Sequence, residues 1–247
     1  RAPATLLAQS LAAYKKGANI AHDNWRIWDN VITLAYRMRP IAVSDLLLGL
    51  RNLVRLKSTE DVLDISVLRV LLNEGVLSKE KPAGDDESKV YEPPRGTEER
   101  AVCEFVEKSV VPLITTRSEL WELVARERIW RRDYAGAIDA AERAWRAAIG
   151  GGGGVGVGAS SLSPSSAKGE AARKNWIEDR EAFGVVLERT EELVSILENY
   201  GERVPELGER WKGKARMAVR SVMGKAKESW EGTEEWEKLD ELLEGLR

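Results

Sequence analysis

The stretch that decides the fold is residues 118–149, SELWELVARERIWRRDYAGAIDAAERAWRAAI. Trp121 and Ala125 are four residues apart, which places a large and a small side chain on one face of a helix. Small side chains return at helical spacing in the second half, at Ala137 and Ala144. Small residues let two antiparallel helix backbones approach closely, and aromatic residues fill the space that remains. The stretch therefore predicts a helical hairpin.

The same positions fit the tetratricopeptide repeat pattern without a gap, with Tyr134 at the aromatic position of the turn. One such hairpin cannot bury its own apolar face, so it needs neighbours stacked on it. The sequence predicts an all-α fold, a tetratricopeptide-like solenoid of helical hairpins with long C-terminal capping helices.

Two compositional breaks define the predicted domain organisation. A polar loop at 76–96 contains three prolines and has no periodicity, and a Gly/Ser-rich stretch at 150–169 reads as a disordered linker. We expect a repeat array at 1–149, with its best repeat at 118–149. Residues 170–247 should form capping helices of the same solenoid, because two long apolar stripes, at 170–200 and 207–230, and a short one after Thr233 carry charged opposite faces.

Two helix assignments depend on glycine. Residues 3–16 predict a helix that ends at Gly17. Residues 61–74, DVLDISVLRVLLNE, are apolar on nearly all sides and suit either a buried strand or a buried helix. The helical segments on both sides and Gly75 as a stop favour the helix.

Composition describes a globular chain rather than a disordered or fibrous one. Of 247 residues, 43% are hydrophobic and 32% are charged, and the formal net charge is -3. Because the net charge is small, the chain as a whole exerts no strong electrostatic attraction on nucleic acid or anionic membranes. Cys103 is the only cysteine and His22 the only histidine, so we expect no disulfide, no metal site and no cofactor. The single cysteine suits a reducing compartment, and we expect a cytoplasmic protein that also enters the nucleus.

Three phrases carry a resemblance to a known family. They are DNWRIWDNVI at 23–32, KNWIEDREAFGVVLERTEELVSILENYG at 174–201 and GTEEWEKLDELL at 232–243. Together they resemble the C-terminal region of the tetratricopeptide repeat protein 27 family, whose fungal members are described as needed for cell-wall integrity. The resemblance implies an all-helical repeat array and a non-enzymatic adaptor, with chaperone machinery, its clients or protein assemblies as partners. It offers no catalytic residues to carry over.

Repeats of this kind bind partners along a groove lined by the first helix of each hairpin. The repeat frame places six candidate groove residues there: Arg26, Asn30, Thr33, Glu119, Glu122 and Arg126. The first two occupy positions where chaperone-binding repeats clamp a C-terminal carboxylate. Glu119 and Leu123 stand where that clamp needs two further cations, so the clamp is half present.

Two functional hypotheses follow. The first is a scaffold or adaptor that holds protein partners during folding or assembly, and it is not an enzyme. The alternative is an RNA-associated factor that binds through basic helical faces. Its motivation is two sets of basic residues, Arg126, Arg128, Arg131 and Arg132 around Trp130, and Lys212, Lys214, Arg216, Arg220, Lys225 and Lys227 along one late helix.

Overall fold

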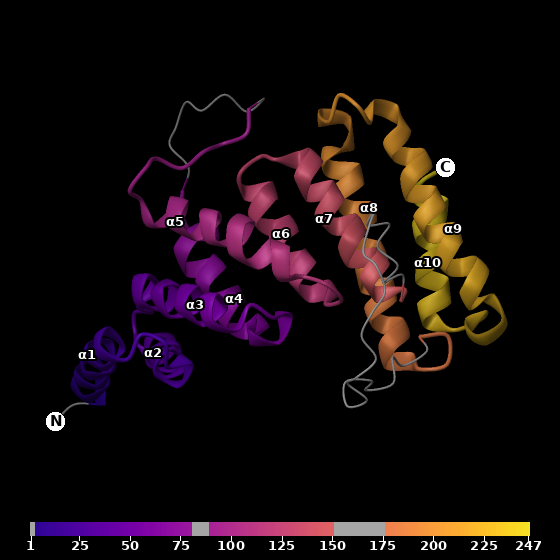
Figure 1. The fold of residues 1–247 in the computed structure, drawn as a ribbon. Helices are drawn as coiled ribbons and strands as arrows, with labels where there is room; N and C mark the ends of the chain where they lie inside the picture. Colours follow the sequence, from indigo (N-terminus) through magenta and orange to yellow (C-terminus); the bar gives the residue numbers. More distant parts are fainter. Residues whose placement is uncertain (1–2, 81–88, 151–175) are drawn as a thin grey trace, which may run out of the picture. The chain divides into compact units, whose positions relative to one another are not determined.

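The computed structural model describes residues 3–80, 89–150 and 176–247, and within them every regular element is a helix (Figure 1). The all-α, tetratricopeptide-like fold predicted from the sequence is therefore confirmed. The α-helices are α1 (Pro3–Ile20), α2 (Trp25–Arg37), α3 (Val43–Lys57), α4 (Ile65–Leu72), α5 (Glu98–Phe105), α6 (Ser118–Trp130), α7 (Tyr134–Ala148), α8 (Arg180–Tyr200), α9 (Trp211–Trp230) and α10 (Glu234–Gly245).

The chain divides into two compact units. The first contains residues 1–115 and 123–133, and the second contains residues 116–122 and 134–247. The helix α6 thus contributes its first turn to the second unit and its remainder to the first. The predicted linker at 150–169 lies outside the described residues, except for Gly150.

The first unit begins with three packed helices, α1, α2 and α3. Their apolar stripes meet around Leu11, Trp28 and Val31, which are all buried. A Cβ atom at Gly49 of α3 would lie 2.7 Å from Cγ1 of Ile32 in α2. Glycine at this position therefore lets the two helices pack closely.

Helix caps explain where several helices begin. The side chain of Asn24 accepts a hydrogen bond from the backbone N–H of Arg26 at the start of α2. Asp64 caps α4 in the same way. Such side-chain acceptors satisfy backbone donors that have no partner inside the helix.

The segment 61–74, whose pattern suits a strand or a helix, is largely helical. It runs from the end of a short 3-10 helix (Glu60–Val62) through α4 into a π-helical turn (Asn73–Leu77). Gly75 is buried within that turn and does not end the helix before it. A Cβ atom there would lie 3.0 Å from a methyl group of Val102 in α5, so the glycine serves close packing.

The second unit packs α7, α8, α9 and α10 around one apolar cluster. Phe183 of α8 stacks between two tryptophans, with ring centroids 5.9 Å from Trp176 and 4.7 Å from Trp230. Where α8 ends, a Cβ atom at Gly201 would lie 2.5 Å from Cβ of Trp211. That distance is too short for any side chain, so Gly201 sets how closely α9 approaches the end of α8.

Two predicted helix boundaries are wrong. The helix at the start of the chain does not end at Gly17 but continues to Ile20, because the backbone N–H of Ala21 still bonds the carbonyl of Gly17. The helix expected at 170–200 begins at Arg180, because Asp179 caps it by accepting a hydrogen bond from the N–H of Ala182. Residues 176–179 are not helical, and residues 170–175 lie outside the described part of the chain.

Candidate functional site

The predicted groove residues of α2 form one exposed stripe. Arg26, Asn30 and Thr33 follow a spacing of four and three residues and are all exposed. The Nδ2 of Asn30 donates a 2.9 Å hydrogen bond to the carbonyl of Arg26. The guanidinium carbon of Arg26 lies 5.2 Å from the ring centroid of Trp25, and Nζ of Lys57 lies 3.6 Å from it. Two cations therefore flank an aromatic ring beside the stripe.

The predicted groove residues of α6 differ in exposure. Arg126 is exposed and Glu119 is half-buried. Glu122 is buried, and its carboxylate lies 3.0 Å from Nη1 of Arg189 in α8. It therefore makes an ion pair inside the second unit instead of lining an open groove. Leu123, at a clamp position, is also buried.

The basic cluster around Trp130 contains two arginines that point into the protein. The Nε of Arg128 lies 3.0 Å from Glu107, and Nη2 of Arg131 lies 2.6 Å from the same carboxylate. Arg131 also reaches Glu127, whose side chain has no exposed surface, at 2.6 Å. Two of the four arginines of this cluster are therefore engaged in ion pairs within the first unit, whereas Arg126 is exposed.

The surroundings of the single cysteine and the single histidine indicate structural roles. Cys103 is buried in α5, and burial together with the carboxylate of Glu127 raises the pKa of its thiol. A neutral thiol is a poor nucleophile and metal ligand. The backbone carbonyl of His22 accepts a 2.8 Å hydrogen bond from Nε1 of Trp28, which ties the start of α2 to its core.

The basic residues of α9 do lie largely at the surface. Lys212, Arg220, Lys225 and Lys227 are exposed and Arg216 is half-buried, whereas Lys214 pairs with Glu142 of α7. Met217 lies among them with 68% of its surface exposed. Gly213, Arg216, Met217 and Arg220 line a shallow pocket of about 410 Å³. One face of α9 is therefore basic, with an apolar side chain in its middle.

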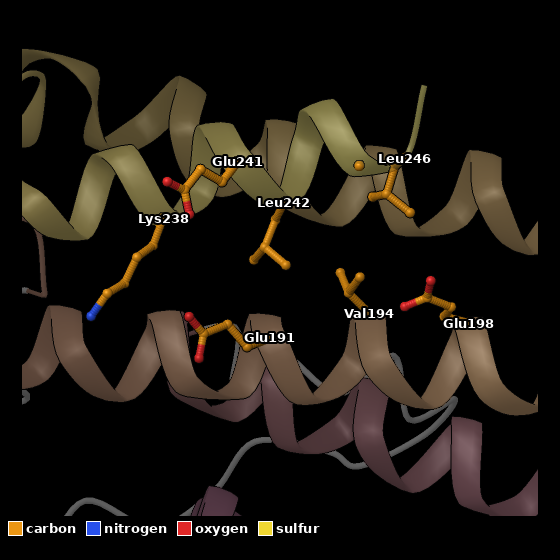
Figure 2. A pocket seen from close by; sticks show the side chains of 8 residues that line it. Glu191, Val194, Glu198, Lys238, Glu241, Leu242 and Leu246 are labelled. Atoms are coloured by element: carbon orange, nitrogen blue, oxygen red, sulfur yellow. The ribbon is translucent and has the colours of Figure 1, made fainter.

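A second pocket, of about 420 Å³, lies between α8 and α10 (Figure 2). Leu242 of α10 and Val194 of α8 face each other in its middle. Lys238 and Glu191 lie toward one end, and Leu246 and Glu198 lie toward the other. Glu241 and Gly245 complete the lining. The pocket thus combines an aliphatic floor with three carboxylates and one ammonium group.

Sequence reasoning did not identify the α8–α10 pocket. It assigned the leucines and the valine to the apolar stripes of the capping helices, and burial of Val194 and Leu246 agrees with that assignment. A signal was present in the carboxylates, since Glu191 and Glu198 are seven residues apart and so share a face beside the stripe. The sequence did not indicate that α10 would pack along α8 and place Glu241 beside Glu191 and Glu198.

Neither a metal centre nor a membrane span is found among the described residues. In those residues no group of three or more His, Cys, Asp or Glu side chains is arranged to hold a metal ion. Among the helices described, none combines the length and apolar character needed to cross a bilayer.

The fold places the chain in the class of all-helical proteins with tetratricopeptide-like hairpins. Two fungal relatives confirm the resemblance found in the sequence, and the name of the first agrees with this class. A TPR repeat-containing protein of Schizosaccharomyces pombe is 29% identical over 246 residues, which is 97% of this chain and 26% of the relative. The protein "Essential for maintenance of the cell wall protein 1" of Saccharomyces cerevisiae is 26% identical over 230 residues, or 90% of this chain and 22% of the relative.

The chain spans about a quarter of the length of the relatives it matches. No family model and no solved structure matches it.

Proposed function

We propose that this chain is part of a non-enzymatic helical-repeat scaffold that holds other proteins. The observation that carries the proposal is the exposed stripe of α2, Arg26, Asn30 and Thr33, on the first helix of a hairpin whose opposite side is buried. Tetratricopeptide-like hairpins use this helix to contact their partners. The name of the S. pombe relative supports the same class of function.

In this proposal the scaffold serves as an adaptor for chaperone machinery, its clients or assembling complexes, in the cytoplasm and nucleus. The S. cerevisiae relative is named for maintenance of the cell wall, which supports a role of this chain in the same process. In this proposal residues 170–247 form capping helices, and Arg126 adds to the partner surface of the first unit, whereas Glu119 belongs to the second. Glu122 contributes by positioning α6 through its ion pair with Arg189.

Affinity capture with crosslinking tests the scaffold proposal. The variant Arg26→Glu/Asn30→Ala should lose a defined set of crosslinked proteins that the unmodified chain captures. Arg69→Glu is the matched control, because Arg69 is an exposed arginine on α4 of the same unit. Equal capture by both variants would remove the α2 stripe from the partner surface. If no protein is captured beyond the level of an unrelated helical protein, the scaffold proposal is wrong.

A second candidate function is RNA binding through the basic face of α9. The exposed side chains of Lys212, Arg220 and Lys227 favour it, because cations along one helix face can neutralise successive phosphates. Titration of a single-stranded oligouridylate at low and high salt tests it. Binding that weakens steeply with salt and is lost in Arg216→Gln/Arg220→Gln would establish this function, and an absence of binding at low salt would exclude it.

A further inference from the structure

We propose that the pocket between α8 and α10 binds a basic segment of a partner protein that carries a leucine-like side chain, which would specify one partner surface of the proposed scaffold. The occupant follows from two features of the lining, its aliphatic floor and its excess of negative charge.

The floor of the pocket is aliphatic and comes from two helices of the same unit. Leu242 of α10 and Leu246, the residue that follows the helix, are four positions apart, and Val194 of α8 faces Leu242 (Figure 2). A volume of about 420 Å³ falls within the range of about 300–1,000 Å³ found for pockets that bind ligands. An aliphatic side chain inserted between these residues would lose its contact with water, and this burial favours binding.

The rim of the pocket is acidic. Glu198 and Glu241 are exposed and Glu191 is half-buried. In the part of the chain that the structure describes, no cation lies within ion-pair distance of these three carboxylates, whereas Lys238 lies 3.5 Å from Glu234. The lining therefore has three carboxylates available to a partner, and its one ammonium group, that of Lys238, lies beside Glu234. Such a rim favours Lys or Arg on the partner and disfavours Asp or Glu.

The arrangement of the lining also suggests the form of the partner. Glu191 and Glu198 lie two helical turns apart along α8, with Val194 between them. A segment that lies along the pocket would place one aliphatic side chain over Val194 and a basic residue near each end. The basic residues and the aliphatic residue would then be about one helical turn apart on a partner helix.

Fluorescently labelled synthetic peptides test the proposal on the full chain. The probe is an amidated peptide of about 12 residues, or roughly three helical turns, with leucines on one face and Lys or Arg beside them. One comparison peptide replaces every basic residue by Glu, and another replaces every leucine by Ser. We expect fluorescence anisotropy to show that the basic leucine peptide binds and that the two comparison peptides do not. Binding of the basic leucine peptide should weaken as the salt concentration is raised.

Matched charge variants locate the binding site. Glu191→Gln/Glu198→Gln should weaken peptide binding about tenfold, since it removes two rim charges. Leu242→Ser should also weaken peptide binding, because it replaces an aliphatic side chain in the floor of the pocket by a polar one. Glu209→Gln/Glu228→Gln is the control, because it removes the same charge from exposed residues that do not line the pocket. Unchanged circular dichroism spectra would show that all variants fold.

Each outcome decides between occupants. Equal weakening by the pocket and control variants, or equal binding of the acidic peptide, would overturn the proposal. A second copy of this chain is the rival occupant, because the basic face of α9 carries Met217; concentration-dependent dimers that the pocket variants abolish, with no peptide binding, would also overturn it. If capture still depends on Arg26 and Asn30 in that case, the scaffold function stands and only the pocket assignment falls.

Discussion

Each unit contains a cluster of buried charges, and the two clusters differ in balance. In the first unit, Glu107 and Glu127 meet Arg128 and Arg131, so that two carboxylates face two guanidinium groups. In the second, one arginine, Arg189, contacts three carboxylates, those of Glu122, Glu188 and Glu192. A balanced cluster neutralises its charges locally, whereas the second leaves negative charge in excess. The single arginine of the second cluster should therefore be harder to replace.

The largest effect is expected for Arg189→Met. The side chain of Arg189 is 4% exposed and that of Glu122 is 6% exposed, so the variant leaves a buried carboxylate without this cation. Removal of one partner from a buried pair costs about 3–5 kcal/mol. Urea-induced unfolding measures the loss, and hydrogen exchange should show that α8 opens more readily.

A double variant separates charge from packing at this position. Glu122→Gln/Arg189→Met removes both the arginine and the buried carboxylate, so it should regain part of the stability lost by Arg189→Met. A loss below about 1 kcal/mol in the single variant would show that Arg189 behaves as a surface arginine.

Arg131→Met should have a smaller effect in the first unit. Arg131 bridges Glu107 and the fully buried Glu127, but its side chain is 16% exposed and Arg128 remains beside Glu107. We expect a loss of about 2–3 kcal/mol, between the values for buried and exposed ion pairs. The same urea titration measures it, and a loss equal to or larger than that of Arg189→Met would contradict the comparison of the two clusters.

The contrast between the clusters also shows what the sequence could and could not predict. Helical periodicity and small residues identified the helices at 118–130 and 134–148, because local spacing determines which side of a helix is apolar. The burial of Trp121, Ala125 and Ala137 follows from the same spacing.

Charged residues were harder to place. Sequence reasoning assigned Glu122 to a binding groove and Arg131 to a basic surface, yet both lie in ion pairs with residues of other helices or turns. Whether a charge on a helix is exposed depends on which helix packs against it. That information lies in long-range contacts, such as those between Glu122 and Arg189, and not in the spacing within one helix. The same reason explains why the α8–α10 pocket was missed.

Two glutamates should respond to pH with opposite signs. Burial alone would raise the pKa of Glu107, but hydrogen bonds and attraction from Arg128 and Arg131 lower it overall. Its contribution to stability is therefore present above the unfolded pKa and is lost as pH falls through the folded pKa. Burial raises the pKa of Glu192, and Glu122 adds to this, against the attraction of Arg189. Its contribution is present below the unfolded pKa and is lost as pH rises through the folded pKa.

Urea titrations over a range of pH around the unfolded glutamate pKa of about 4.3 measure both effects. Glu107→Gln should be less stable than the unmodified chain at neutral pH, and the difference should shrink on acidification. Glu192→Gln should gain stability relative to the unmodified chain as pH rises. Difference curves of the same sign for the two variants would disprove the contrast.

The smallest effect is expected for an exposed arginine in the second unit. The guanidinium carbon of Arg143 lies 4.9 Å from the ring centroid of Trp121, and half of the Arg143 side chain is exposed. A cation over an aromatic face at such a site contributes about 0.5–1 kcal/mol, so Arg143→Ala should lose about that much in the urea titration. Arg143→Lys keeps a cation over the ring and should lose less. If Arg143→Ala instead costs as much as Arg189→Met, then solvent exposure does not determine how strongly an arginine stabilises this unit, and the distinction between its buried and exposed charges fails.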